Sequence, residues 1–123
     1  MGSPSPSDIK RKQDRAPLRI PIYYAKQGQQ HQTYSCDICS GGLGMIAEHH
    51  LPVGTKTRLR FTHPFLGKIM LYEGEVKWAK PIQIDGHDGE QWAVGIGFSN
   101  MDDSDARMMD DLVHDILPPA KPR

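Results

Sequence analysis

The sequence predicts a mainly β fold, a small six-stranded antiparallel β-barrel followed by a C-terminal α-helix. Between residues 18 and 98, apolar and polar side chains alternate in short stretches, which is typical of strands with one buried face. Turns that contain glycine or proline separate these stretches. After residue 100 the apolar side chains recur every three or four residues, which indicates one amphipathic helix. Short strands followed by a single helix favour a barrel that the helix closes.

The first strand is predicted over Leu18–Ala25, where apolar and polar residues alternate. Pro17 and Pro21 favour an extended backbone and exclude a helix through this stretch. A polar turn that contains one glycine is expected next, over residues 26–32.

The second strand is predicted over residues 33–38, and it ends in a glycine-rich bend. The side chains expected to face the core are those of Tyr34, Cys36 and Ile38. Asp37 would then face outward, where a ligand can reach it. Three glycines lie within four residues of the bend, namely Gly41, Gly42 and Gly44. This spacing predicts a sharp change of backbone direction, with φ > 0 at one or more of these glycines.

Four further strands complete the predicted barrel, over residues 43–47, 55–62, 68–80 and 91–98. In the longest of them, one face is expected to hold Met70, Tyr72, Gly74, Val76 and Trp78. The helix is predicted from its apolar stripe, which consists of Met108, Met109, Leu112, Val113 and Ile116. Aspartates near its start oppose the positive end of the helix dipole, and two prolines end it.

At 123 residues the chain has room for one hydrophobic core. Residues 1–9 are rich in serine and proline and are expected to form a disordered leader. The domain is expected over residues 10–117 and begins with a basic entry segment, while residues 118–123 are expected to be a flexible tail. The chain is therefore predicted to be a free-standing domain that acts on a separate partner.

Composition and charge argue against several classes of protein. The formal net charge is zero, so general attraction to nucleic acid is not expected. The charge is nevertheless sorted, because six basic residues face two acidic ones up to position 30, and six aspartates face one arginine between 102 and 115. No apolar run reaches the roughly 20 residues that span a bilayer, so membrane insertion is not expected. Without a secretory signal or a disulfide framework, the chain is predicted to be cytoplasmic.

The sequence offers little for catalysis or metal binding. Cys36 and Cys39 fit a C-x-x-C pattern, but zinc needs about four ligands, and a redox site would place the pair at the start of a helix. Glu73 and Glu75 share a strand face, where solvation explains them better than a catalytic pair. We therefore expect a protein that is not an enzyme and carries no cofactor.

The basic entry segment and the bend after Asp37 together suggest a nucleotide site. Arg11 and Arg15 lie four residues apart, and each offers a planar fork to phosphate oxygens or a flat face to a base. Lys10 adds less specific positive charge. Asp37 can accept hydrogen bonds from the N1–H and N2–H₂ edge of a guanine, and the glycines let a flat base approach the backbone. These parts describe a site for a guanine nucleotide with several phosphates.

These residues resemble the two sequence marks of the PilZ domain family. The first mark, R-x-x-x-R, is matched by Arg11–Arg15. Arg15–Arg19 also fits, but we prefer the first register because a strand follows it directly. The second mark, D/N-x-S-x-x-G, is matched in order and spacing by Asp37–Gly42, with Cys39 in the place of the serine. The closing strand and the helix are similar as well, so the resemblance covers about residues 10–117.

The resemblance implies binding of the bacterial second messenger cyclic di-GMP. By that resemblance, Arg11 and Arg15 would hold phosphates and guanine faces, Asp37 would read a guanine edge, and Gly42 would shape the bend. Trp78 could stack on a base, although a place in the core is at least as compatible with its pattern. The residues expected to bind the ligand are Lys10, Arg11, Arg15, Asp37, Cys39, Gly41, Gly42 and Trp78.

Two outcomes remain open within the family. In the first, the ligand orders residues 8–16 and changes the surface offered to an unidentified downstream protein. In the second, Cys39 has weakened the site so far that the domain is an adaptor that works by protein contact alone. A nucleic-acid-binding barrel is a rival from another class, but it would need exposed aromatic residues beside Arg58 and Arg60. A C-x-x-C redox protein is a more distant alternative.

Overall fold

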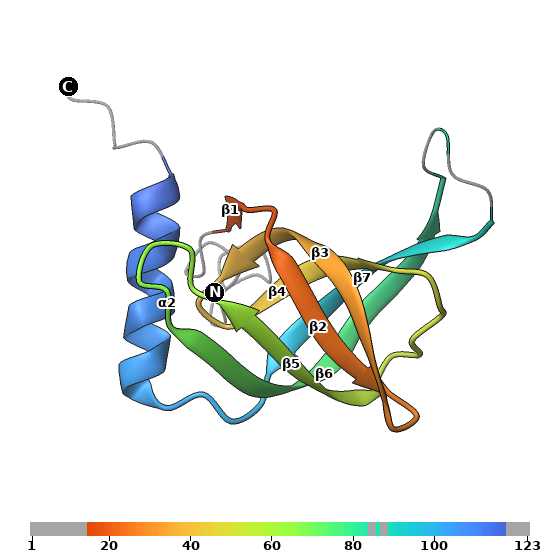
Figure 1. Ribbon diagram of the computed structural model, residues 1–123, viewed down its shortest axis with the longest axis horizontal. Coiled ribbons are helices and arrows are strands. Elements are labelled where there is room, and N and C mark those ends of the chain that lie inside the picture. The colour runs from red at the N-terminus through yellow and green to blue at the C-terminus, as the bar shows by residue number, and fades with distance from the viewer. Residues whose placement is uncertain (1–14, 84–85, 87–88, 118–123) are drawn as a thin grey trace, which may run out of the picture.

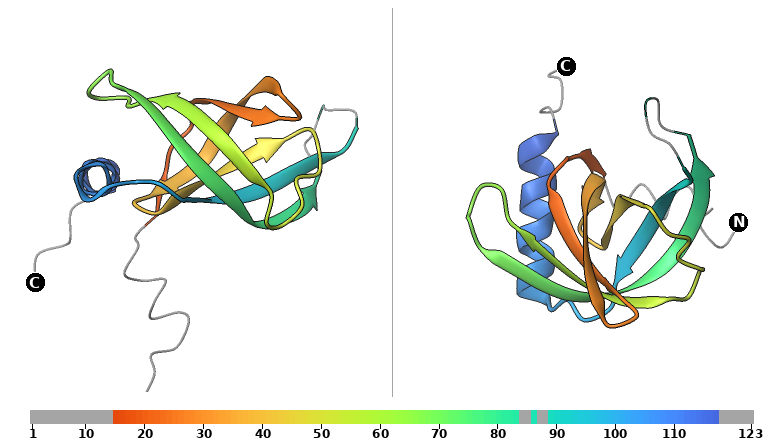
Figure 2. Two further views of the ribbon diagram at one scale, coloured as in Figure 1. Left: turned by 90° about the horizontal axis from the view of Figure 1, so that it is seen from below. Right: turned by 45° about the vertical axis from the view of Figure 1, so that its right-hand side comes forward.

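Six strands close into the barrel that the sequence predicts, and one helix lies beside its end (Figure 1; Figure 2). The computed structural model describes residues 15–83, 86 and 89–117. Its elements are β1 (Ala16–Pro17), β2 (Pro21–Lys26), β3 (Gln29–Cys39), β4 (Gly42–Ala47), β5 (Lys56–Thr62), β6 (Ile69–Ile82), β7 (Gln91–Phe98) and α2 (Asp103–Ile116). The order around the barrel is β3-β2-β5-β6-β7-β4, and β4 pairs again with β3. All of these pairings are antiparallel, and β1 adds a short pairing to β3.

The barrel interior and the helix share one hydrophobic core. The largest fully buried side chains are those of Phe61, Ile22, Ile38, Leu43, Met45, Leu51, Leu59, Met70, Met109, Leu112, Val76 and Val94. Helix α2 buries Met109, Leu112 and Val113, at the spacing that its sequence predicts, and it contacts β1 and β3. Asp102 caps this helix, because its carboxylate accepts the N–H of Asp105 at 2.8 Å. The predicted helix and its acidic start are confirmed.

The turn between β2 and β3 is much tighter than predicted. Gln27 and Gly28 have φ angles of 53° and 77°, as in the two-residue turns that suit the right-handed twist of a β-hairpin. Residues 29–32, predicted as turn, are therefore strand and pair with β2. Their polarity misled the prediction, because none of their side chains is fully buried. At its other end, β2 begins at Pro21 rather than at Leu18.

The prediction of which β3 side chains face the core is wrong at Tyr34 and Cys36. Both are exposed, whereas Ser35 is buried. A bulge between Ser35 and Asp37 shifts the register against β4, so that Ile38 still reaches the core as predicted. The extra residue of a bulge leaves no mark in an alternating pattern, yet it inverts the faces on one side of it.

The predicted leader, the predicted tail and residues 10–14 lie outside the described residues, so the domain bounds stay a prediction. Within the described part of the chain, no helix is long and apolar enough to cross a bilayer. Arg15, the first residue that the structure describes, lies directly before β1.

Candidate functional site

Four glycines lie on the outer face of the barrel where β4 passes β7. Gly42 and Gly44 of β4 pair with Gly97 and Gly95 of β7. The residues that alternate with them are buried in the core. Because successive side chains of a strand point to opposite faces, all four glycines share the outer face and contribute no side chain to it. The side chains of Asp37, Lys77 and Trp78 lie over three of them. We call this surface the glycine floor.

Three glycines of the glycine floor, Gly42, Gly95 and Gly97, line a pocket of about 240 Å³. One wall carries Arg15, which precedes β1, and Cys39, which ends β3. The opposite wall carries Lys77 and Trp78 of β6. The residues that line the pocket are Arg15, Cys39, Gly41, Gly42, Leu43, Lys77, Trp78, Gly95, Ile96 and Gly97.

Arg15 and Asp37 form a bidentate ion pair at the edge of this pocket. Nε of Arg15 donates to Oδ2 at 2.9 Å, and its Nη2 donates to Oδ1 at 2.8 Å. These hydrogen bonds lower the pKa of Asp37 and raise the pKa of Arg15, in each case against the opposing effect of partial burial. The backbone N–H of Gly44 also bonds to the carboxylate. Both side chains therefore stay charged at neutral pH.

Cys39 lies under the same arginine. Its side chain is buried, and its Sγ accepts a hydrogen bond from Nη1 of Arg15 at 3.4 Å. A thiol sulfur is a weak acceptor, so this contact holds Arg15 less firmly than a hydroxyl oxygen would. Cys36 is exposed, in contrast to Cys39. Among the residues that the structure describes, no three His, Cys, Asp or Glu side chains gather where they could hold a metal ion.

The glycines of the bend provide space rather than an unusual backbone conformation. None of Gly41, Gly42 and Gly44 has a positive φ, so that prediction is wrong. A Cβ on Gly42 would lie 2.1 Å from the carbonyl oxygen of Ile96, and one on Gly44 would lie 2.6 Å from Oδ1 of Asp37. Glycine is required because β7 and the Asp37 carboxylate approach the β4 backbone this closely.

Trp78 lies on the outer face of the barrel and not on the face that it was predicted to share with Met70 and Val76. A bulge between Val76 and Trp78 turns the indole outward, where 45% of the residue is accessible. The indole covers Gly95, since a Cβ on that glycine would lie 2.1 Å from Nε1 of Trp78. Of the two roles that the sequence left open for Trp78, its position is compatible with stacking on a ligand.

Sequence analysis missed Lys77, Gly95 and Gly97. The Lys77 side chain passes over Gly97, with Cε 2.9 Å from the position of a Cβ there. Its Nζ lies 3.8 Å from the Glu75 carboxylate. A signal was present, because Gly-x-Gly occurs both at the bend and in the last strand, and glycines two apart share a strand face. The two Gly-x-Gly patterns can be assigned to one site only when β4 is known to lie beside β7.

The structure brings together six of the predicted residues, namely Arg15, Asp37, Cys39, Gly41, Gly42 and Trp78. Lys10 and Arg11 lie outside the described residues. Arg19, the alternative partner in the R-x-x-x-R pattern, does not line this pocket. Its guanidinium stacks on the ring of Tyr34, 4.3 Å from the centroid.

Comparison with protein families now decides what this barrel is. The family model of the PilZ domain matches residues 9–115. The chain belongs to the PilZ domain family. The match takes in Lys10 and Arg11 as well as the barrel and helix α2. None of the curated proteins compared with the chain matches it significantly.

Solved PilZ structures share the fold at low sequence identity. The inhibitor of motility MotI/DgrA of Bacillus subtilis is 14% identical, with a TM-score of 0.68 over 86% of this chain and 50% of its own. The PilZ domain of YcgR from Escherichia coli, solved with c-di-GMP, is 13% identical, with a TM-score of 0.67 over 87% and 91%. The MrkH–c-di-GMP complex of K. pneumoniae is 19% identical, with a TM-score of 0.65 over 85% and 51%. This PilZ chain thus spans about half the length of MotI/DgrA and MrkH.

Proposed function

We propose that this PilZ domain is a receptor for cyclic di-GMP and has no catalytic activity of its own. The observation that carries the proposal is the glycine floor, set between the Arg15–Asp37 pair and Trp78. The glycines contribute no side chains of their own, so a planar purine can reach the backbone when Lys77 and Trp78 move aside, and the indole offers the base a stacking face. The guanidinium offers charge-assisted hydrogen bonds to phosphate. The relatives solved with c-di-GMP support this choice of ligand.

The contacts of Asp37 suggest how a guanine would be read. A carboxylate has about four lone-pair positions for hydrogen bonds. Arg15 uses two of them, and the Gly44 N–H uses another. A guanine edge with its N1–H and N2–H₂ groups needs two, so its binding displaces at least one of these three hydrogen bonds, and we propose that it is one from Arg15. The released N–H of Arg15 would then turn to a phosphate of the ligand.

The pocket of about 240 Å³ is smaller than the roughly 300–1,000 Å³ of most small-molecule sites. We propose that the segment before Arg15 completes it, with Arg11 and Lys10 adding charge to the phosphate side. Ordering of this segment on the ligand would change the surface presented to a downstream protein, whose identity is open.

One observation favours a second candidate function, an adaptor that binds no nucleotide. Cys39 stands where the family pattern has serine, and its thiol meets Arg15 at 3.4 Å in the place where a ligand contact is expected. If the serine contributes one hydrogen bond to the ligand, its loss weakens binding by about tenfold. The charge-assisted contacts of Arg15 remain, so we place the receptor first.

Isothermal titration of the purified chain with cyclic di-GMP tests the proposal, with GTP and cyclic di-AMP as controls. We expect micromolar or tighter binding of cyclic di-GMP and no comparable heat from either control. GTP carries one guanine and cyclic di-AMP carries none, so the controls separate recognition of guanine from attraction of phosphate. No heat with any of the three, together with unchanged amide shifts at Arg15 and Asp37, would leave the adaptor as the function.

A further inference from the structure

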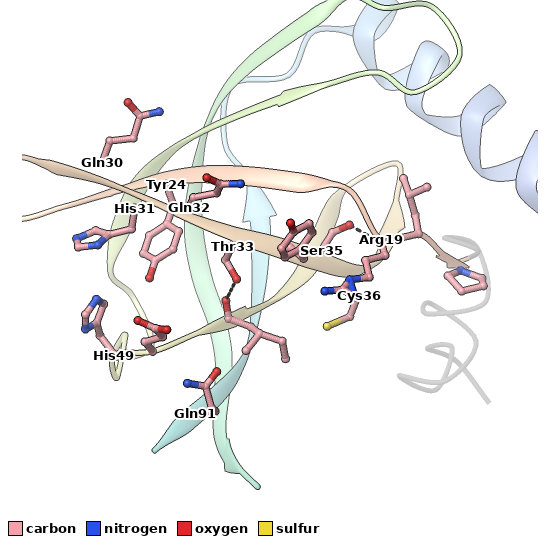
Figure 3. Close-up of a pocket in the computed structure, with 15 residues that line it drawn as sticks. Arg19, Tyr24, Gln30, His31, Gln32, Thr33, Ser35, Cys36, His49 and Gln91 are labelled. Atoms are coloured by element: carbon pink, nitrogen blue, oxygen red, sulfur yellow. Dashed lines mark hydrogen bonds between the residues drawn. The ribbon is translucent and has the colours of Figure 1, made fainter. Parts of the chain in front are cut away.

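The barrel wall opens between β3 and β4, at a distance from the glycine floor. β2 pairs with β3 from Gln29 to Tyr34, whereas the register of β4 against β3 begins only at Ser35. Residues 29–34 of β3 thus have a strand on one side and no aligned β4 residue on the other. We call this stretch the open edge. Side chains bridge part of the gap: the Thr33 hydroxyl donates to the Ile46 carbonyl oxygen (dashed in Figure 3).

A cleft of about 1,080 Å³ lies along the open edge. Figure 3 shows Gln30, His31 and Gln32 on its β3 side and His49 and Gln91 across from them. None of the residues that line this cleft lines the pocket over the glycine floor. It is therefore a separate surface feature.

The backbone of the open edge points donors and acceptors into this cleft. The N–H of Ser35 donates to the carbonyl of Ile20 at 3.0 Å, which is on the β2 side. In an antiparallel strand the residues alternate between the two neighbours. Thr33 and His31 therefore also turn toward β2, while the N–H and C=O groups of Gln30 and Gln32 turn toward the cleft.

The free edge of β6 differs from the open edge of β3 in its residue types. Beyond Val76, which still bonds to Gly54 and Thr55 before β5, β6 continues to Ile82 with β7 on one side only. That stretch carries Lys77, Lys80 and Pro81, the residue types that deter a further strand from adding to an edge. The open edge reads Gln-Gln-His-Gln-Thr-Tyr and carries neither lysine nor proline. The free edge of β6 is therefore protected against the addition of a further strand, and the open edge of β3 is not.

We propose that the open edge receives an extended segment of a partner protein, which adds to β3 as an antiparallel strand along the line that β4 leaves. Main-chain bonds to Gln30 and Gln32 would supply affinity, as in other cases of strand addition. Arg19 indicates the side-chain chemistry, because it is exposed on the ring of Tyr34 and pairs with no carboxylate in the part of the chain that the structure describes. The segment therefore carries an acidic side chain that meets Arg19.

The test uses a displayed library of random dodecapeptides, selected on the full chain without nucleotide and counter-selected on Gln32→Pro. The best peptide is synthesised and titrated by fluorescence anisotropy. We expect Gln32→Pro, which removes one donor and places a ring in the edge, to lower its affinity by about tenfold or more. Gln32→Ala keeps the backbone donor and is the matched control, expected within about twofold of the parent chain. Amide shifts should concentrate at Gln30 and Gln32.

Arg19→Gln gives an independent arm. It should weaken the selected peptide, and replacing the acidic residue of that peptide should remove the difference between the parent chain and Arg19→Gln. If thermal unfolding shows that Gln32→Pro does not fold, Gln30→Pro with Gln30→Ala as its control takes its place. Because every arm omits cyclic di-GMP, failure of the nucleotide proposal leaves this test unaffected.

Three results would overturn the proposal. One is a selection that yields no peptide able to distinguish the chain from its proline variant. Another is equal loss of affinity in the proline and alanine variants, which would mean that side chains rather than the backbone edge bind the peptide. The third is a concentration-dependent dimer in sedimentation that Gln32→Pro removes, because a second copy of this chain would then occupy the edge.

Discussion

The two ends of β3 have different neighbours and different exposed surfaces. Residues 35–39 have β1 on one side and β4 on the other, and they hold Asp37 and Cys39 of the pocket over the glycine floor. The open edge, residues 29–34, has β2 on one side and a cleft of about 1,080 Å³ on the other. The bulge between Ser35 and Asp37 separates them. One inserted residue thus lets a single strand serve a ligand pocket at one end and an exposed edge at the other.

The largest expected effect is a loss of affinity for cyclic di-GMP when Arg15, which lines the pocket, is replaced. Arg19, which lines the cleft, provides the comparison. Arg15→Ala should lower the affinity for cyclic di-GMP by about a hundredfold or more, because it removes charge-assisted hydrogen bonds that a neutral side chain cannot replace. Arg19→Ala, the matched control, should leave that affinity within about twofold, because Arg19 stacks on Tyr34 beside the cleft. Isothermal titration of both variants measures the difference.

Equal losses of affinity for cyclic di-GMP in Arg15→Ala and Arg19→Ala would contradict the separation of pocket and cleft. They would show that Arg15–Arg19 is the functional R-x-x-x-R pair, and that the segment around Arg19 moves to the pocket on binding. An unchanged affinity in Arg15→Ala would contradict the site itself.

A smaller effect is expected from the two tryptophans. Trp78→Ala should lower the affinity for cyclic di-GMP by about tenfold to a hundredfold, the usual range for one base stacked on an aromatic ring. Trp92→Ala is the control, because that ring stacks on His50, 4.3 Å between centroids, and does not line the glycine-floored pocket. Quenching of tryptophan fluorescence by the ligand offers a second readout, which should persist in Trp92→Ala and fall in Trp78→Ala.

Cysteine substitutions should sharpen the comparison within β3 itself. Cys39→Ser should raise the affinity for cyclic di-GMP by up to about tenfold. A hydroxyl is a better acceptor for Arg15 and a better donor to the ligand than a thiol. Cys36→Ser changes the same atoms at an exposed position that lines the cleft, and it should leave the affinity unchanged. Weaker binding in Cys39→Ser would instead mean that this buried position needs an apolar group.

The smallest effect should come from acid. The Arg15 hydrogen bonds lower the pKa of Asp37 in the folded state, so the pair adds stability above the unfolded pKa of about 3.9. That contribution is lost as the pH falls through the lowered pKa. The two side chains are 45% and 36% accessible, so solvent limits the contribution to less than about 1 kcal/mol.

Urea unfolding of the parent chain and of Asp37→Asn checks this expectation. The difference in free energy of unfolding should be constant from about pH 5 to pH 8 and shrink below about pH 4. Adding Arg15→Ala to both chains should remove most of the difference, because only the contact with the Gly44 N–H then remains. A difference that grew on acidification would show that the pKa of Asp37 is raised.

Much of the fold could be predicted because burial on one face leaves a period in the sequence. The alternation through residues 55–62 and the apolar stripe around Met109 and Leu112 predicted β5 and α2 correctly. Residues 29–32 of the open edge were predicted as turn because their side chains are polar on both faces of the strand. A strand that lacks a buried face shows no alternation of apolar and polar residues from which it could be predicted.

The candidate site was predicted in part, and what escaped prediction has structural causes. Arg15 and Asp37 were found because they belong to a short pattern, and the structure joins them. The role of Trp78 was left open between stacking and the core, because the bulge that turns it outward cannot be seen in an alternation. Gly95 and Gly97 escaped because their role depends on β7 lying beside β4, a pairing between strands far apart in sequence.

The most direct test of the account is a titration of the ¹⁵N-labelled chain with cyclic di-GMP, followed by amide and indole shifts. The account predicts large shifts at Gly42, Gly95 and the Trp78 indole N–H, with Gln30 and Gln32 unchanged. That result would establish that the nucleotide occupies the glycine floor and leaves the open edge free. Saturation that left the glycine and indole signals in place, or that shifted only the open edge, would contradict the account.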